Sequence, residues 1–169
     1  MKYREYLSAA RKHVQTSEVL YDSLSIQLQQ QPLNNGATKR LTLNLYYISG
    51  YVIECVLKYG IYALIGYDKD MDITKINSKG ITYNNKIKHH KFSMYDELFN
   101  REYPGLILID RKETISPEVK KLYNGWDAEI RYVYNPIPEK FKHSDEHIHV
   151  MKFNEHAKTI FKHVESNIR

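Results

Sequence analysis

The longest apolar segment of the chain, KRLTLNLYYISGYVIECVLKYGIYALIG, spans residues 39–66. Its apolar residues recur three or four positions apart, as on one face of a helix, and further apolar residues fall on the other faces. A helix that is apolar on almost every face is buried. Gly66 suits the left-handed position that often ends a helix. The segment therefore predicts a central helix on which the other segments pack.

The same segment is long enough to span a membrane, but Glu54, Lys58 and Gly60 interrupt it, and the sequence has no second segment like it. A charge at bilayer depth costs about 2.5–3.5 kcal/mol on insertion scales. We therefore expect no membrane span. The N-terminal sequence MKYREYLSAARKH lacks the apolar stretch of a signal peptide, so we expect a cytoplasmic protein.

Four other segments carry helix signals. A three-four repeat of apolar residues predicts a first long helix over 3–28, and the turn signals around Pro32 reverse the chain before the central helix. A short helix is expected over 92–103. A long helix is expected from the N-cap Ser116 to about residue 132, and a last one from about 144 to 168.

These elements predict an all-α fold, an antiparallel bundle of four long helices plus a short helix. At 169 residues the chain has the length of one domain, so we expect a single domain over 1–169. The polar connection over 67–90 is too long for a simple turn and favours a loop or a small β-hairpin insertion. The apolar run GLILID at 105–110 fits a brief strand or an extended loop.

Three aspartates open this connection in the manner of a calcium loop. They are Asp68, Asp70 and Asp72, but Ile73 stands where such a loop needs glycine and Lys79 where it needs glutamate. We interpret the aspartates as solvated charge.

A basic cluster closes the same connection and consists of Lys86, Lys88, His89, His90 and Lys91. Such a cluster is either a solvated face or an anion-binding patch. The net charge of +5 permits a nucleic-acid or acidic partner without requiring one. Most of the 15 tyrosines have core-like spacing, and the remainder have rings that can stack on bases.

Histidines are concentrated in and before the last predicted helix: His143, His147, His149, His156 and His163. The last three recur by sevens, which predicts an exposed basic stripe. No carboxylate or cysteine completes a metal-binding set by local spacing, so we expect neither a metal nor a cofactor. The single cysteine, Cys55, lies within the apolar segment and is expected to be a buried hydrophobic residue.

The sequence has no Gly-rich phosphate loop, nucleophile elbow or paired His-Glu zinc motif, which removes most familiar enzyme classes. Glu54 and Lys58 lie one helical turn apart, either as a pair at the edge of the packed face or as part of a binding site. Asp127, Arg131 and Tyr132 precede a Pro-bounded turn, where an arginine can grip phosphate and a tyrosine can flank a base. Alternatively, Arg131 pairs with Asp127 or caps helix carbonyls.

Four features of the sequence occur together. They are the pattern YYISGYVIECVLKYGIYAL in the central helix, His90 with Leu98 downstream, Trp126 followed by Arg131-Tyr132 and a Pro-rich turn, and a last helix with Ala157 inside. In this combination the chain resembles the HEPN (higher eukaryotes and prokaryotes nucleotide-binding) domain family. The resemblance implies a helical bundle that forms a homodimer and binds RNA, a nucleotide or a partner protein such as a nucleotidyltransferase. It also implies a role in a toxin–antitoxin or phage-defence system.

On this resemblance the binding residues would be Glu54, Lys58, His90, Asp127, Arg131 and Tyr132. Ribonuclease members of the family carry an arginine and a later histidine with four to six residues between them, and Arg131 matches that arginine. The histidine is missing, because Pro136, Ile137 and Pro138 occupy its place.

RNA cleavage of this kind needs a proton acceptor, a proton donor and a cation at the phosphate. Arg131 can supply the cation, and His143 and His90 are the more remote candidates for proton transfer. The enzyme question stays open, and the missing histidine favours a protein without catalysis. The alternatives are a HEPN-like binding protein, a non-catalytic dimeric structural or interaction module, and a degenerate metal-independent ribonuclease.

Overall fold

The computed structural model describes residues 1–30, 36–102, 115–133 and 146–168. Its helices are α1 (Arg4–Gln30), α2 (Gly36–Leu64), α3 (Phe92–Glu102), α4 (Pro117–Gly125) and α5 (His147–Asn167). The described part of the chain is therefore mostly helical, in agreement with the expected all-α class. The GLILID run, the prolines after Tyr132 and His143 lie outside the described residues.

Helix α2 lies at the centre of the molecule, in contact with α1, α5, α3 and the turn after α4. Eighteen of its 29 residues are buried, which confirms the prediction of a central helix. The helix begins at Gly36, three residues before the predicted start, and Gly66 just beyond its end adopts φ +67°. Only glycine adopts such a backbone at little cost, so Gly66 ends the helix as its sequence predicts.

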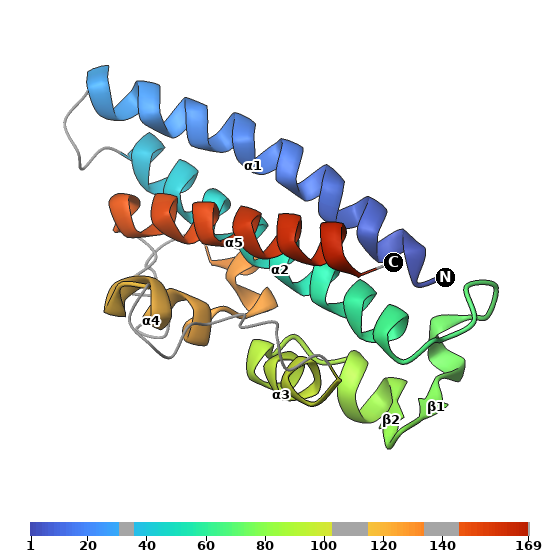
Figure 1. Cartoon of the computed structure of the whole chain (residues 1–169). Helices are drawn as coiled ribbons and strands as arrows, with labels where there is room; N and C mark the ends of the chain where they lie inside the picture. The colour runs from blue at the N-terminus through green and yellow to red at the C-terminus, as the bar shows by residue number, and fades with distance from the viewer. Residues whose placement is uncertain (31–35, 103–114, 134–145, 169) are drawn as a thin grey trace.

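The three long helices lie side by side, and α3 and α4 cover the side of α2 away from α1 (Figure 1). Helices α1 and α2 run in opposite directions. Tyr3 stacks on Tyr62 with ring centres 5.7 Å apart, and the tilted rings of His13 and Tyr51 lie 5.5 Å apart. Helix α5 is antiparallel to α1. Tyr21 in the C-terminal half of α1 donates a hydrogen bond to Glu155 in the N-terminal half of α5, and Arg11 in the N-terminal half of α1 donates one to Glu165 near the end of α5.

Helices α2 and α5 run in the same direction, which corrects the expected antiparallel bundle. Ser49 accepts a hydrogen bond from Asn154 early in α5, and Tyr59 donates one to the carbonyl of Ile168 after its end. The reason is topological, because the chain between α2 and α5 returns to the start of the bundle through α3 and α4 (Figure 1).

The helix predicted from Ser116 to about residue 132 is wrong beyond Gly125. Ser116 caps α4 through Val119 N and Pro117 is its first residue, as predicted. Trp126 then adopts an extended backbone, and Asp127 caps a separate 3-10 helix, η3 (Ala128–Tyr132). The part of the bundle that the structure describes therefore contains three long α-helices and two short ones.

The connection after α2 contains short elements. A 3-10 helix, η1 (Ile73–Lys75), precedes a hairpin of β1 (Asn77–Ser78) and β2 (Ile81–Thr82), and a π-helix, η2 (Tyr83–Ile87), follows. Tyrosines of α2 and its end hold the segment down, because Tyr62 and Tyr67 donate to the carbonyls of Ile73 and Asp72. The side chain of Asp72 caps η1 through Thr74.

None of the helices that the structure describes is long and apolar enough to cross a membrane.

Candidate functional site

Glu54 and Lys58 form an ion pair in the interior. Lys58 Nζ donates to Glu54 Oε1 at 2.8 Å, and the two residues are only 4% and 5% exposed. Their spacing along α2 places both on one stripe. A charged pair this deeply buried must satisfy its hydrogen bonds inside the protein. The pair is therefore part of the core and does not itself face solvent.

Aromatic rings enclose the ammonium of Lys58. Its Nζ lies 5.7 Å from the ring centre of Tyr6 on α1 and 5.9 Å from that of Tyr95 on α3, within the range at which ring faces attract a cation. Tyr95 also donates a hydrogen bond to the carbonyl of His89. Burial, followed by the charge of Glu54, raises the pKa of Tyr95 above its ordinary value, so its hydroxyl remains a donor.

His90 connects the buried pair to the surface. Its Nδ1 lies 2.8 Å from Oε2 of Glu54, while the His90 side chain is 45% exposed. Both oxygens of the Glu54 carboxylate are therefore engaged, one by α2 itself and one by the loop before α3. The imidazole is fixed at its inner edge and open at its outer edge.

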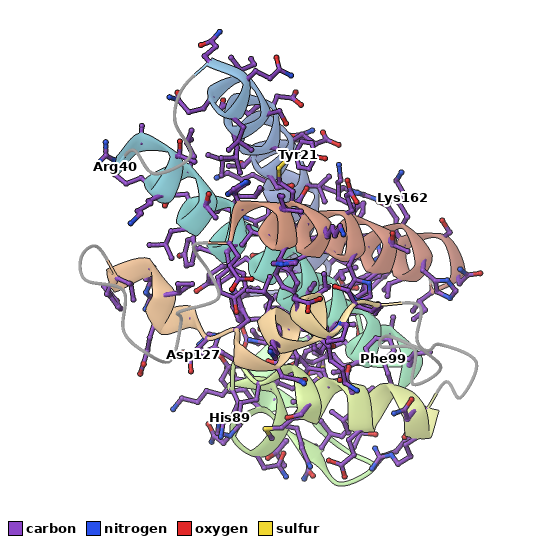
Figure 2. The ribbon with its side chains drawn as sticks, turned by 90° about the vertical axis from the view of Figure 1, so that its left-hand side faces the viewer. Tyr21, Arg40, His89, Phe99, Asp127 and Lys162 are labelled. Atoms are coloured by element: carbon purple, nitrogen blue, oxygen red, sulfur yellow. The ribbon has the colours of Figure 1, made fainter. Side chains whose placement is uncertain are left out.

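An open cleft of about 610 Å³ lies beside this imidazole. Its lining consists of Asn84, Lys88, His89, His90, Lys91 and Asp127. Figure 2 shows His89 and Asp127 at the same edge of the molecule, with Lys162 of α5 on the other side. Basic side chains outnumber the single carboxylate, so the cleft favours an anionic ligand.

A second cleft, of about 340 Å³, shares Lys91 and Asp127 with the first. Its walls include Phe92 and Trp126, whose rings stack at 4.9 Å with an interplanar angle of 7°. Trp126 packs so closely on α2 that a Cβ at Gly50 would lie 1.9 Å from its Nε1. The two clefts together place cationic side chains beside these two rings, which are themselves largely buried.

Arg131 and Tyr132 are exposed on η3. The guanidinium carbon of Arg131 lies 4.6 Å from the ring centre of Tyr132. Tyr132 itself is 74% exposed. Partial desolvation lowers the pKa of Arg131, but Tyr132, Tyr51 and Tyr47 together raise it above its usual value. The guanidinium is thus a permanent surface cation stacked on an exposed ring.

One stripe of α2 links these features. Tyr47, Tyr51, Glu54 and Lys58 recur at intervals of four, three and four, which places them on one side of the helix. Arg131 interacts electrostatically with the two tyrosines, and His90 bonds the glutamate. The structure therefore brings Glu54, Lys58 and His90 into direct contact. Arg131, which belongs to η3, lies beside the two tyrosines of this stripe and not beside the ion pair.

The remaining predicted residues divide between these regions. Asp127 lines both clefts, and its side chain accepts a hydrogen bond from the backbone N–H of Glu129 at 2.9 Å. His143 lies outside the described residues. Burial, and then the charge of Glu54, raises the pKa of Cys55 to about 12, which agrees with an inert buried thiol.

The predicted exposed histidine stripe is wrong in part. His163 is exposed, but His149 and His156 are half-buried because α4 packs against this part of α5. His156, for example, lies 6.1 Å from the buried ring of Tyr123. No group of three metal-binding side chains occurs among the residues that the structure describes.

Two further titratable residues were not among those predicted from the sequence. Asp96 on α3 accepts a hydrogen bond of 2.7 Å from the hydroxyl of Tyr123 on α4, and burial raises the pKa of Asp96 to about 6. His13 on α1 packs on Tyr51, and burial lowers its pKa. Periodicity could have placed each on an inner helix edge, but their partners come from other helices.

The chain was compared with protein families, with curated proteins and with solved structures, and none of them matches it. By its described residues the protein is a predominantly helical bundle, and its function is inferred from its own side chains.

Proposed function

We propose that the protein is a HEPN-like RNA-binding protein that holds the phosphate backbone of a single strand in the basic cleft. The observation that carries the proposal is the lining of that cleft by Lys88, His89, His90 and Lys91, with His90 anchored to the buried Glu54. Contacts between basic side chains and backbone phosphates supply much of the affinity of proteins for nucleic acids, and this row of side chains can make such contacts.

The neighbouring aromatic surface supports a nucleic acid over a free anion. Tyr132 presents an exposed ring, and Arg131 covers one of its faces. Proteins that bind single strands combine a basic groove with aromatic or guanidinium planes on which bases stack. A ligand with both phosphates and bases uses both kinds of surface, whereas inorganic phosphate uses only one.

The proposal is for binding without catalysis. Glu54 and Lys58 are buried and engaged with each other, and the histidine that would follow Arg131 in a ribonuclease of this family is missing. The proposed setting is a homodimer in a toxin–antitoxin or phage-defence system, with a nucleotidyltransferase as a candidate partner. That setting follows from the resemblance alone.

The test is the binding of a labelled single-stranded RNA pool by fluorescence anisotropy at several salt concentrations. We expect an affinity that falls steeply with salt, and a Lys88→Gln/Lys91→Gln variant that binds more weakly with a shallower salt slope. Lys162→Gln, which removes an exposed lysine on another face, is the matched control. Undetectable binding at low salt would contradict the proposal.

The same samples distinguish binding from cleavage. Cleavage of the RNA pool without added metal by the wild-type protein, and its loss in Arg131→Ala, would favour the degenerate ribonuclease instead. Intact RNA in both samples is the expected result.

A further inference from the structure

His90 both lines the basic cleft and contacts the buried ion pair. Its Nδ1 faces Glu54 Oε2 at 2.8 Å, a distance at which one proton must lie between the two atoms. The other oxygen of the same carboxyl accepts from the ammonium of Lys58 at 2.8 Å. A carboxylate that already balances a buried ammonium is an acceptor, so the proton belongs to Nδ1 of His90.

This arrangement selects one tautomer of the neutral imidazole. With its proton on Nδ1, the ring carries a lone pair on Nε2, at the opposite edge. The His90 side chain is 45% exposed, and its ring lines the cleft of about 610 Å³. Among the described residues, Nε2 has no hydrogen-bond partner. The cleft therefore contains an oriented hydrogen-bond acceptor among its cations.

We propose that Glu54 is a positioning residue that holds His90 in the Nδ1–H tautomer, so that Nε2 accepts a hydrogen bond from a ribose 2′-hydroxyl and the cleft prefers RNA to DNA. The proposal rests on the proposed function and specifies its substrate class. Lysines contact phosphates of RNA and DNA alike, whereas an acceptor directed at the sugar distinguishes the two, because only ribose has the 2′-hydroxyl donor.

The surroundings of His90 are mixed in charge. Glu54 and Lys58 face it from α2, Asp127 from the start of η3, and Lys88, His89 and Lys91 belong to its own segment. The tautomer is measured at about pH 8.5, because a histidine side chain in water is neutral at that pH and the two tautomers exist only in the neutral ring.

The first measurement is nitrogen NMR of the wild-type protein, with His90 assigned by comparison with His90→Phe. We expect the Nδ1 signal of a protonated nitrogen and the Nε2 signal of an unprotonated one. The opposite pattern would overturn the proposal whether or not RNA binds, because it would place the acceptor at the inner edge.

The second measurement compares the affinities of the wild-type protein for RNA and DNA strands of the same sequence at that pH. One hydrogen bond corresponds to a preference of about fivefold for RNA. His90→Phe keeps a ring of similar size and removes both nitrogens, so we expect nearly equal affinities. Lys91→Gln should lower the affinity for both strands by similar factors, so the preference for RNA should remain. Equal binding by the wild type, or a preference that survives in His90→Phe, would overturn the inference.

Glu54→Gln tests the positioning role separately. The amide keeps the shape of the side chain but can donate to Nδ1, so we expect a mixture of tautomers and a smaller ratio of RNA affinity to DNA affinity than in the wild type. A merely structural role would change the melting temperature and leave the tautomer unchanged. Failure of the wild-type protein to bind either strand contradicts the proposed function and its ribose specificity, whereas the NMR pattern still decides the role of Glu54.

Discussion

His90 Nδ1 lies 2.8 Å from Glu54 Oε2, and this contact joins a half-exposed residue of the loop before α3 to the centre of the most buried helix. The distance along the chain is 36 residues. The contact makes the basic cleft and the core of the protein parts of one hydrogen-bonded unit. Changes at Glu54 or Lys58 should therefore affect both stability and binding.

Removing one member of the buried pair should destabilise the fold. Lys58→Met leaves the Glu54 carboxylate without its ammonium, which we expect to lower the free energy of unfolding by about 3–5 kcal/mol. The double variant Glu54→Leu/Lys58→Met removes both charges and should recover most of that loss. Chemical denaturation measures both. Equal losses in the single and double variants would show that lost packing, and not the unpaired charge, causes the effect.

Gly50→Ala should be among the most damaging small substitutions. The added methyl group would lie 1.9 Å from Trp126 Nε1 and 2.0 Å from its Cε2, and both residues are buried. Overpacking of this kind costs about 1–3 kcal/mol or more. Gly125→Ala is the matched control, because its Cβ would meet only the Tyr46 hydroxyl, at 3.9 Å. Similar melting temperatures for the two variants would contradict the close packing at Gly50.

Asp96 should make stability depend on pH in a defined window. Burial raises its pKa from 3.8 to about 6, so the folded protein holds a proton that the unfolded chain has released. This contribution is complete below about pH 4 and is lost as the pH rises to about 6, by up to about 3 kcal/mol.

Asp96→Asn isolates that effect. The amide oxygen can still accept from Tyr123, but it carries no charge at any pH. We expect the variant to be more stable than the wild type at neutral pH and to have a flatter stability profile between pH 4 and 6, measured by denaturant titration. A constant difference in stability between the two proteins across that window would exclude the effect.

Arg131→Ala should change binding and leave stability intact. The side chain is exposed and stacks on its own neighbour, so we expect a change in unfolding free energy of less than about 0.5 kcal/mol. If the guanidinium contacts a phosphate, the salt slope of RNA binding falls by about one. Anisotropy titrations over a salt series measure this slope. A slope equal to that of Lys162→Gln would place Arg131 outside the interface.

The sequence was sufficient for much of the helical architecture. Segment 39–66 carries apolar residues on almost all faces of its helix. A helix with that pattern is buried, so it belongs at the centre of the fold. Ser116-Pro117 and Gly66 mark local helix ends because capping is a property of the adjacent backbone. The i,i+4 relation of Glu54 and Lys58 is local as well, so their contact could be predicted from the sequence.

The tertiary structure decided the rest. Periodicity continues through Trp126 and Asp127, but the packing of Trp126 on Gly50 and Phe92 and the cap at Asp127 divide the predicted helix in two. The parallel course of α2 and α5 depends on how the intervening segments return, which no local pattern records.

Whether a site residue lies in the core or at the surface was also decided by contacts distant in the sequence. Lys58 is buried because Tyr6 and Tyr95 arrive from two other helices. His90 reaches Glu54 because the preceding turns fold back onto α2. Local propensity and capping act within a few residues and are written in the sequence, whereas the cleft and its histidine depend on contacts between segments that only the folded chain brings together.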